Sequence, residues 1–354
     1  MDAIYTIPVI GIVIQFIGYL IEVLPAIAPI FLATATPVAL GALCGLMNER
    51  SGVVNIGIEG MMLTAAFVGA LVTASLNSSL GTPKLDLFDA TPALILGVLA
   101  AVIAAMIMST IHAWLSITIK ADQIISGTII NILALGLTGY LHQLISRQSP
   151  PNAGTFGQFN PPEVLTDLPL IGWLIRMFFA QGPIAMSVLF IVIVLQVLLF
   201  RSRWGLRTRA VGEHPKAAET VGIDVIRVRY RNVILGGIFA GLAGAYLTLE
   251  SAGSFQTGMT NGRGFIALAA LIFGRWTPIG SLGAAILFYA TAALERAIQF
   301  NTPSGQLGDV LTAIPPQVYS ALPYLITIVI LAGVVGRSTA PAAVGQPYER
   351  EART

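Results

Sequence analysis

The chain has 354 residues, of which 55% are hydrophobic and 10% are charged, and its mean hydropathy is +0.82. Soluble domains carry about 25% charged residues, so this composition excludes an ordinary soluble protein and indicates an integral membrane protein surrounded by lipid. The net charge of +2 gives no basis for a nucleic-acid partner, and the single cysteine, Cys44, excludes an intrachain disulfide and a cysteine-based metal site.

Apolar segments follow one another along the whole chain. We expect ten of them, and therefore an all-α, polytopic membrane fold with about ten transmembrane segments. They lie at about 7–24, 27–47, 54–76, 93–117, 123–145, 184–200, 232–250, 264–274, 279–300 and 321–336. Residues 1–337 then form the transmembrane domain. Residues 338–354, which are rich in Ala, Pro and charged residues, are predicted to form a disordered cytoplasmic tail.

The distribution of basic residues predicts the orientation in the membrane. If the basic stretch 201–231 is cytoplasmic and successive segments alternate in direction, both termini are cytoplasmic. Fourteen Lys and Arg residues then lie inside and four lie outside, as the positive-inside rule requires. The eighth segment is the weak point, because its eleven residues span only about 16 Å of a hydrocarbon core about 30 Å thick.

The third segment begins with two polar residues, Asn55 and Glu59, one helical turn apart, and Gly57 and Gly60 beside them allow another helix to approach. Polar groups are costly inside a bilayer, about 2.5–3.5 kcal/mol for a central charge, so each needs a reason. We expect this pair to line the path of a polar solute. The alternative is that Glu59 braces the fold by binding Arg50 or loop amides.

The fifth segment carries Thr128 and Asn131 on one helical face. A hydroxyl and an amide suit an uncharged, hydroxyl-rich ligand better than an ion, so both residues join the predicted pathway. Interhelical hydrogen bonding is the competing use of such side chains. We expect no metal and no catalytic residue, because no His, Cys or Asp cluster has metal-ligand spacing and no Ser, His and Asp arrangement indicates a triad.

The connection 146–183 is predicted to lie outside the membrane on the extracytoplasmic face. It contains a Pro- and Gly-rich run followed by the apolar stretch LPLIGWLIRMFF, which can lie in the membrane interface as an amphipathic segment. The connection fits either a lid or docking surface or a plain solvated loop.

The stretch 201–231 holds eight of the nineteen basic residues. Within it, Pro215 suits the first position of a short helix and Gly222 suits its left-handed end. Ala217 and Ala218 at the centre allow a partner to approach the backbone closely, so we interpret this helix as a docking site. The alternative is an ordinary basic loop that obeys the positive-inside rule. The residues assigned to docking are Glu213, His214, Pro215, Ala217, Ala218, Glu219 and Gly222.

Two stretches indicate internal symmetry. Each has a basic residue, Arg50 or Arg263, followed by glycine and an apolar helix with small residues, and the two enter the membrane from opposite faces, five segments apart. An inverted repeat requires this relation. Interrupted helices at corresponding positions of such repeats point to a transport pathway near the midplane of the membrane.

The chain contains no P-loop, because its three lysines follow Pro83, Ile119 and Pro215 and none belongs to a Gly-Lys-Ser/Thr sequence. An ATPase of that class needs the sequence to hold phosphate, so we expect the chain not to be an enzyme. If ATP drives transport, a separate subunit binds it, and this chain needs no cofactor of its own.

Three motifs together resemble those of a known family. They are NERSGVVNIGIEGMML at 48–63, SGTIINILALGLT at 126–138, and RAVGEHPKAAETVGI at 209–223 followed by YRNVILGGIFAGLAGAYL. The chain resembles the permease subunit of bacterial ABC importers, in the superfamily of branched-chain amino acid and simple-sugar permeases. Within it the chain is most similar to nucleoside-type members that work with a basic-membrane-protein-like lipoprotein.

The resemblance implies about ten helices in inverted halves, located in the bacterial plasma membrane, and a complex with ATPase subunits, a second permease and an external binding lipoprotein. Ala217, Ala218 and Gly222 match the Ala-Ala-x-x-x-Gly signature of the coupling helix, which sits in a cleft of the ATPase in such importers. The second permease can be identical or different, and the substrate can be a nucleoside or a simple sugar. The alternative class is a stand-alone transporter or channel that uses Glu59 and the pair Glu295 and Arg296 for ion coupling.

Overall fold

The computed structural model describes residues 8–80, 85, 88–146, 152–168, 171–300, 302–303, 305–315, 317–318, 321 and 339–349. Within these residues the chain is almost entirely helical, and its strand pairing is limited to one isolated bridge between Leu85 and Ala90. The prediction of an all-α membrane protein is confirmed at this level.

The described helices begin and end as follows: α1 (Pro8–Glu49), α2 (Ile58–Leu80), α3 (Pro92–Ala113), η2 (Trp114–Thr118), α4 (Gln123–Ser146), α5 (Glu163–Thr166), α6 (Gly172–Phe179), α7 (Pro183–Arg201), α8 (Arg203–Glu213), α9 (Pro215–Thr220), α10 (Val225–Ala245), η3 (Tyr246–Ala252), α11 (Arg263–Phe273), α12 (Pro278–Phe300) and α13 (Gln306–Ala313). The elements η2 and η3 are π-helical turns that continue α3 and α10.

The chain divides into two compact units, and each is described by itself. The first comprises Met1–Ala35, Phe159–Gln181 and Ile286–Gly336, and the second comprises Thr36–Gln158, Gly182–Ala285 and Arg337–Thr354. The residues predicted to line the pathway (Asn55, Glu59, Thr128 and Asn131) and those of the predicted docking helix all belong to the second unit.

The first unit has an apolar cluster formed by the first part of α1, the end of α12, and α13. Its buried residues are Tyr19, Val23, Ile27, Ala297, Ile298, Leu307 and Leu311. The connection 146–183 contributes α5 and α6 to this unit, and α6 is formed by residues 172–179 of the apolar stretch noted in the sequence. Its location in the membrane interface stays a prediction.

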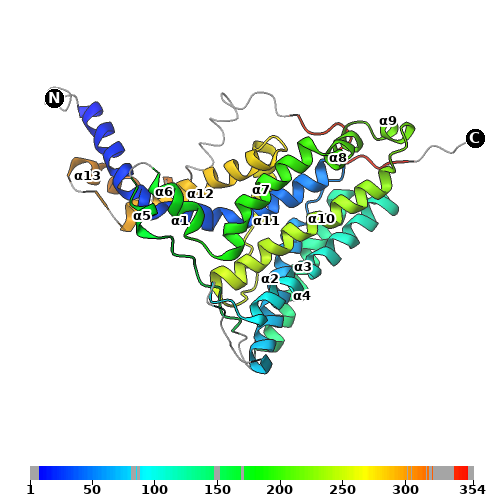
Figure 1. Ribbon diagram of the computed structural model, residues 1–354, viewed down its shortest axis with the longest axis horizontal. Coiled ribbons are helices and arrows are strands. Elements are labelled where there is room, and N and C mark those ends of the chain that lie inside the picture. Colours follow the sequence, from blue (N-terminus) through cyan, green and yellow to red (C-terminus); the bar gives the residue numbers. More distant parts are fainter. Residues whose placement is uncertain are drawn as a thin grey trace, which may run out of the picture. The chain divides into compact units, whose positions relative to one another are not determined.

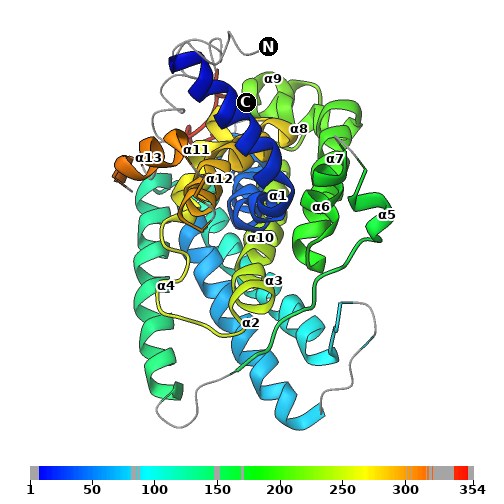
Figure 2. The same ribbon diagram turned by 90° about the vertical axis from the view of Figure 1, so that its left-hand side faces the viewer.

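The second unit is built around helices that lie side by side. Helix α2 packs against α3, α4 and α10, and α10 also packs along α3 (Figures 1 and 2). Small residues allow this close approach. A Cβ atom on Gly241 of α10 would lie 2.5 Å from the Cα of Val102 in α3, and one on Gly237 would lie 2.8 Å from the Cβ of Ser109. Such packing is typical of helices in lipid, where backbones approach through small side chains.

Six helices among the described residues are long and apolar enough to cross a membrane. They are Ile14–Glu49, Ile58–Asn77, Pro92–Thr118, Gln123–Ser146, Pro183–Arg201 and Val225–Ala252, whereas Arg263–Phe273 and Pro278–Ala290 are apolar but shorter. The chain is therefore a multi-pass membrane protein, and the predicted count of ten segments is not confirmed. The tenth segment, 321–336, lies outside the described residues except for Ala321.

The separation of the first two predicted segments is wrong, because the single helix α1 runs from Pro8 to Glu49. The break predicted between residues 24 and 27 falls at Pro25, and proline removes one helical hydrogen bond. In apolar surroundings a loop would leave several backbone groups without hydrogen-bond partners. A helix that continues through the proline loses fewer hydrogen bonds and is therefore favoured.

The stretch 201–231 is more helical than predicted, because it contains α8, α9 and the first residues of α10, which starts at Val225 instead of near 232. The Asp224 carboxylate accepts a hydrogen bond from the amide of Arg227 at 3.0 Å and caps this helix. The hydropathy pattern misplaced the start because three arginines lie in the first two turns. The short helix predicted from Pro215 and Gly222 is confirmed as α9, with Pro215 as its first residue and Gly222 just beyond its end at φ +85°. Its role in docking stays a prediction.

Residues 339–349, here named the C-terminal segment, follow a defined path along the second unit, which corrects the prediction of a disordered tail for these residues. Tyr348 is 8% exposed and packs among Val211, Ala218, Val225 and Val228. The amide of Ala343 donates to the carbonyl of Gly212 at 2.9 Å. Composition predicted disorder because Ala and Pro are abundant, but a single buried aromatic ring and several backbone hydrogen bonds are enough to fix a short segment.

Candidate functional site

The first candidate site lies where the irregular segment 50–57, between α1 and α2, meets α4 and the start of α11. We name it the α2–α4–α11 junction and define it by Asn55, Glu59, Asn131, Gly262 and Gly264. Backbone groups in an irregular segment have no helical partners, and at membrane depth they must find partners in the protein or in water. The polar side chains of the junction supply those partners.

Asn131 of α4 holds the start of α2. Its Oδ1 accepts a hydrogen bond from the amide of Gly60 at 2.7 Å, and its Nδ2 donates to the carbonyl of Ile56 at 3.0 Å. The two helices touch here, since a Cβ atom on Gly60 would lie 2.8 Å from the carbonyl oxygen of Ile130. Interhelical hydrogen bonding, the competing use of Asn131 in the sequence, is thus present in the structure.

Glu59 binds the start of α11. Its two carboxylate oxygens accept hydrogen bonds from the amides of Gly262 at 2.8 Å and Gly264 at 2.6 Å. The negative charge thereby faces the positive end of a helix dipole. A Cβ atom on Gly264 would lie 2.5 Å from the Glu59 amide nitrogen, so the first turns of α2 and α11 are in direct contact. Glu59 therefore binds loop amides, the bracing alternative considered for it.

Asn55 and Thr128 occupy different environments. Asn55 is completely buried, and its Oδ1 accepts a hydrogen bond from the amide of Gly57 at 2.9 Å, which closes a tight turn before α2. Thr128 is exposed, and its hydroxyl donates to the carbonyl of Ile124 in its own helix at 2.9 Å. The structure brings Asn55, Glu59 and Asn131 together in the junction and does not place Thr128 with them.

Two further side chains hold the same segment and were missed as site residues. The Val54 amide donates to Oε1 of Gln123 at 2.7 Å, and the Val54 carbonyl accepts from Nε2 of His112 at 2.9 Å. The other ring nitrogen of His112 lies 3.1 Å from the hydroxyl of Ser126. Their polarity inside apolar segments was a signal, but a sequence does not show which distant backbone groups such side chains reach.

The second candidate site surrounds α8 and α9. Helix α8 ends against the segment 50–57, where a Cβ atom on Gly212 would lie 2.3 Å from the carbonyl oxygen of Arg50. The Arg50 guanidinium donates from Nε to the carbonyl of Trp276 at 2.9 Å. Burial lowers the pKa of Arg50 from its ordinary value, and the neighbouring Glu213 carboxylate opposes that shift.

The two alanines of the predicted docking motif differ in burial within α9. Ala218 is 4% exposed and packs inward in the cluster that contains Tyr348, so it is not available to a partner. Ala217 is exposed on the opposite side of the helix. Lys216 and Thr220 of the same helix are also exposed, and so are the flanking residues His214, Val221 and Gly222. Ala217 is thus exposed together with the polar residues Lys216 and Thr220 and the apolar Val221.

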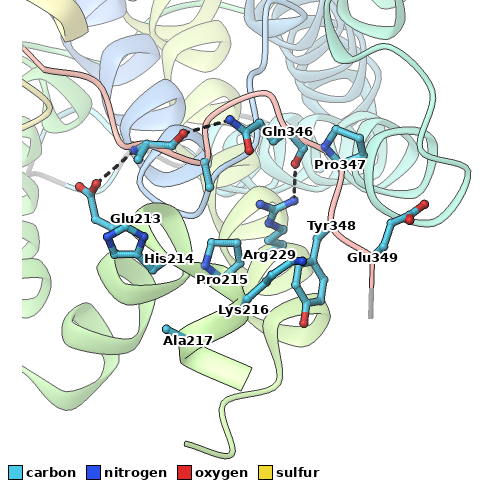
Figure 3. A pocket seen from close by; sticks show the side chains of 12 residues that line it. Glu213, His214, Pro215, Lys216, Ala217, Arg229, Gln346, Pro347, Tyr348 and Glu349 are labelled. Atoms are coloured by element: carbon cyan, nitrogen blue, oxygen red, sulfur yellow. Dashed lines mark hydrogen bonds between the residues drawn. The ribbon is translucent and has the colours of Figure 1, made fainter. Parts of the chain in front are cut away.

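A cavity of about 740 Å³ lies between α9 and the C-terminal segment (Figure 3). The Glu213 carboxylate accepts a hydrogen bond from the amide of Ala342 at 3.1 Å, and the Arg229 guanidinium donates to the carbonyl of Gln346 at 2.9 Å. Both bonds tie the C-terminal segment to the helices beside it. Among the described residues no group of three or more His, Cys, Asp or Glu side chains lies close enough to hold a metal ion.

Comparison with known proteins gives one matching family and several long matches. Residues 27–331 match the family described as branched-chain amino acid transport system, permease component. The chain is 39% identical over 335 residues to the guanosine ABC transporter permease protein NupQ of Bacillus subtilis (strain 168), which covers 93% of this chain and 98% of that protein.

Two further relatives match over similar lengths. The chain is 34% identical to the nucleoside ABC transporter permease protein NupC of Lactococcus lactis subsp. cremoris (93% of this chain, 98% of that protein). It is 36% identical to the putative glucose ABC transporter permease protein TsgC13 of Haloferax volcanii (90% and 95%). No solved structure matches the chain.

Proposed function

Because the chain belongs to the family of branched-chain amino acid transport system permease components, and is thus a permease subunit of an ABC importer, we propose that it forms the translocation pathway for a nucleoside. Two of the three relatives described above are named for guanosine or nucleosides, and one of these has the highest identity of the three. The third is named for glucose, so a simple sugar is the second candidate substrate.

The main support for this mechanism is that one face of α9 is buried against the protein and the other is exposed. Ala218 fixes the helix to the protein, and Ala217 is exposed for a partner. We propose that an ABC ATPase binds this outer face and that closure of the ATPase pair on ATP moves α9 and α8. Since Gly212 at the end of α8 contacts Arg50, that movement reaches the segment 50–57 and the start of α2.

The pathway in this proposal runs beside the α2–α4–α11 junction. The contact between the first turns of α2 and α11 supports this position. Interrupted helices at membrane depth are tolerated where they line a cavity, and there their backbone groups can face a solute. Asn55, Glu59 and Asn131 hold this backbone in place, and the exposed Thr128 is the candidate for direct contact. An architecture of ten segments in inverted halves belongs to the same proposal.

The assembly follows from the family. We propose a bacterial plasma-membrane complex of this chain with a second permease, identical or different, two ATPase subunits that bind ATP, and an extracytoplasmic binding lipoprotein. Both termini then lie in the cytoplasm. At Glu59 the geometry does not favour the ion-coupled alternative, because both carboxylate oxygens already accept hydrogen bonds from backbone amides. The side chains of Glu295 and Arg296, which that alternative also uses, lie outside the described part of the structure.

The test measures the substrate and the energy source together. Binding of radiolabelled adenosine, guanosine, ribose and galactose to the partner lipoprotein is followed by uptake into vesicles that contain the full complex, with and without ATP. We expect nucleoside uptake that requires ATP and the ATPase. Uptake that continues without either would contradict the importer, and uptake of ribose or galactose alone would replace the nucleoside with a sugar.

A further inference from the structure

The cavity beside α9 has two walls that come from distant parts of the chain. One wall is α9 with the residue before it, and its lining includes His214, Lys216 and Ala217. The other is the C-terminal segment, through Ala342, Pro347 and other residues. Figure 3 shows both sets of side chains around one hollow. A partner protein that enters the cavity to reach the outer face of α9 therefore also contacts the C-terminal segment.

The inner side of the C-terminal segment is fixed at several points. The Tyr348 hydroxyl donates to the Glu219 carboxylate of α9, and its ring packs against Ala218 and neighbouring apolar residues. The amide of Gly345 donates to the carbonyl of Gly52 at 3.2 Å. Together with the bonds of Ala342 and Ala343 to the end of α8, these contacts give the segment a set position relative to α9.

The outer side of the same segment is exposed. Ala342, Gln346, Pro347 and Glu349 are accessible on it, and all four line the cavity. A short segment that is anchored on one side and exposed on the other forms a preorganised surface, because its backbone is already ordered before a partner arrives.

The cavity also contains an incompletely bonded cation. Arg229 is 1% exposed and lines the cavity, and its guanidinium lies over the Tyr348 ring at 5.9 Å. One nitrogen donates to the carbonyl of Gln346, but Nε and Nη2 have no hydrogen-bond partner among the described residues. Both nitrogens are enclosed by the protein, and a Cβ atom on Gly52 would lie 2.7 Å from Nη2, so Arg229 lies between the C-terminal segment and the segment 50–57.

We propose that the C-terminal segment and α9 form one composite docking surface for the ATPase subunit, and that the ATPase contacts both walls of the cavity. This inference rests on the proposed coupling role of α9. It adds residues 342–349 to the docking surface. Through the bond between Gly345 and Gly52, it also provides a second link from the ATPase to the segment that precedes α2.

The experiment compares three arginine substitutions in the complete complex. Ala342→Arg places a large charge on the C-terminal wall, and Ala217→Arg does so on α9. Val164→Arg, in α5 at a position 81% exposed, is the control. The amount of ATPase that copurifies with the permease is measured at equal permease abundance. We expect a loss of about tenfold for Ala342→Arg and Ala217→Arg and no change for Val164→Arg.

A photo-crosslinking residue placed at 342, 217 or 164 provides an independent readout that does not depend on affinity. We expect crosslinks to the ATPase from 342 and 217 and none from 164. If Ala342→Arg keeps the ATPase bound and position 342 gives no crosslink, while Ala217→Arg loses the ATPase, the composite surface is overturned and the coupling role of α9 stands. If Ala217→Arg also keeps the ATPase, the proposed coupling role itself is overturned.

Discussion

The α2–α4–α11 junction and the proposed docking surface formed by α9 and the C-terminal segment differ in where their polar side chains are directed. At the junction Glu59 and Asn131 form hydrogen bonds with backbone groups of neighbouring segments. At the docking surface Lys216 and Gln346 are exposed beside Ala217. Where water is absent, polar side chains must pair with the backbone, whereas at a surface that water reaches they are also accessible to a partner. Polar side chains therefore support the backbone in one region and are proposed to contact a partner in the other.

The largest effect expected at the junction comes from a single methyl group. A Cβ atom on Gly127 of α4 would lie 2.7 Å from the amide nitrogen of Gly57, whereas one on Gly136 of the same helix meets nothing within 4 Å. Gly127→Ala should destabilise the protein by about 1–3 kcal/mol because the helices must separate. Gly136→Ala should be neutral or slightly stabilising because alanine favours helix. Thermal unfolding in detergent measures both, and equal midpoints would contradict the contact between α4 and the segment 50–57.

A smaller effect is expected from removing the amide that joins α4 to α2. Asn131→Ala removes the hydrogen bonds to the Gly60 amide and the Ile56 carbonyl, at a cost of about 0.5 kcal/mol for each, because both bonds are only partly buried and water can replace the lost partner. Thr128→Ala removes a hydroxyl that bonds its own helix, so its unfolding midpoint should stay near that of the wild type. If Thr128→Ala is the less stable variant, the assignment of structural and exposed roles on α4 is wrong.

The smallest effect on stability is expected from Glu59→Gln, and its effect on uptake distinguishes a bracing role of Glu59 from a role in ion coupling. In Glu59→Gln the side-chain oxygen can still accept one hydrogen bond from the amide of Gly262 or Gly264. The side-chain NH2 group faces the other amide and cannot accept its hydrogen bond, so the start of α11 should be bound less tightly. Uptake should become less efficient yet remain dependent on ATP at every pH gradient tested. The control is Glu59→Asp, which keeps the charge. A wild-type protein whose uptake follows the proton gradient, with that dependence lost in Glu59→Gln, would show a proton-coupled role.

Local signals predicted some elements well. Proline at the start and glycine just past the end defined α9, because both act through their own backbone geometry. The three sequence motifs indicated the permease family, to which the chain belongs. Hydropathy placed α3, α4 and α7 within a few residues, since a membrane span is a property of a continuous stretch.

Features that depend on contacts between distant segments were not predicted. The sequence indicated polar residues near α2 but not that Gln123 and His112 hold the backbone of Val54. It also indicated two equivalent alanines in α9, although packing makes one buried and the other exposed. The position of the C-terminal segment depends largely on Tyr348, whose partners lie in α8, α9 and α10. No composition or periodicity within residues 338–354 contains that information.

The most direct test of the central claim is ATP-dependent nucleoside uptake by the complete complex with Ala217→Arg, and with Ala217→Ser as the control for substitution itself. Ala217 is exposed, so both variants should reach the membrane and unfold at the wild-type temperature. We predict that Ala217→Arg abolishes uptake and ATPase binding while Ala217→Ser keeps both. Full ATP-dependent uptake by Ala217→Arg would contradict the claim that the outer face of α9 couples this permease to its ATPase.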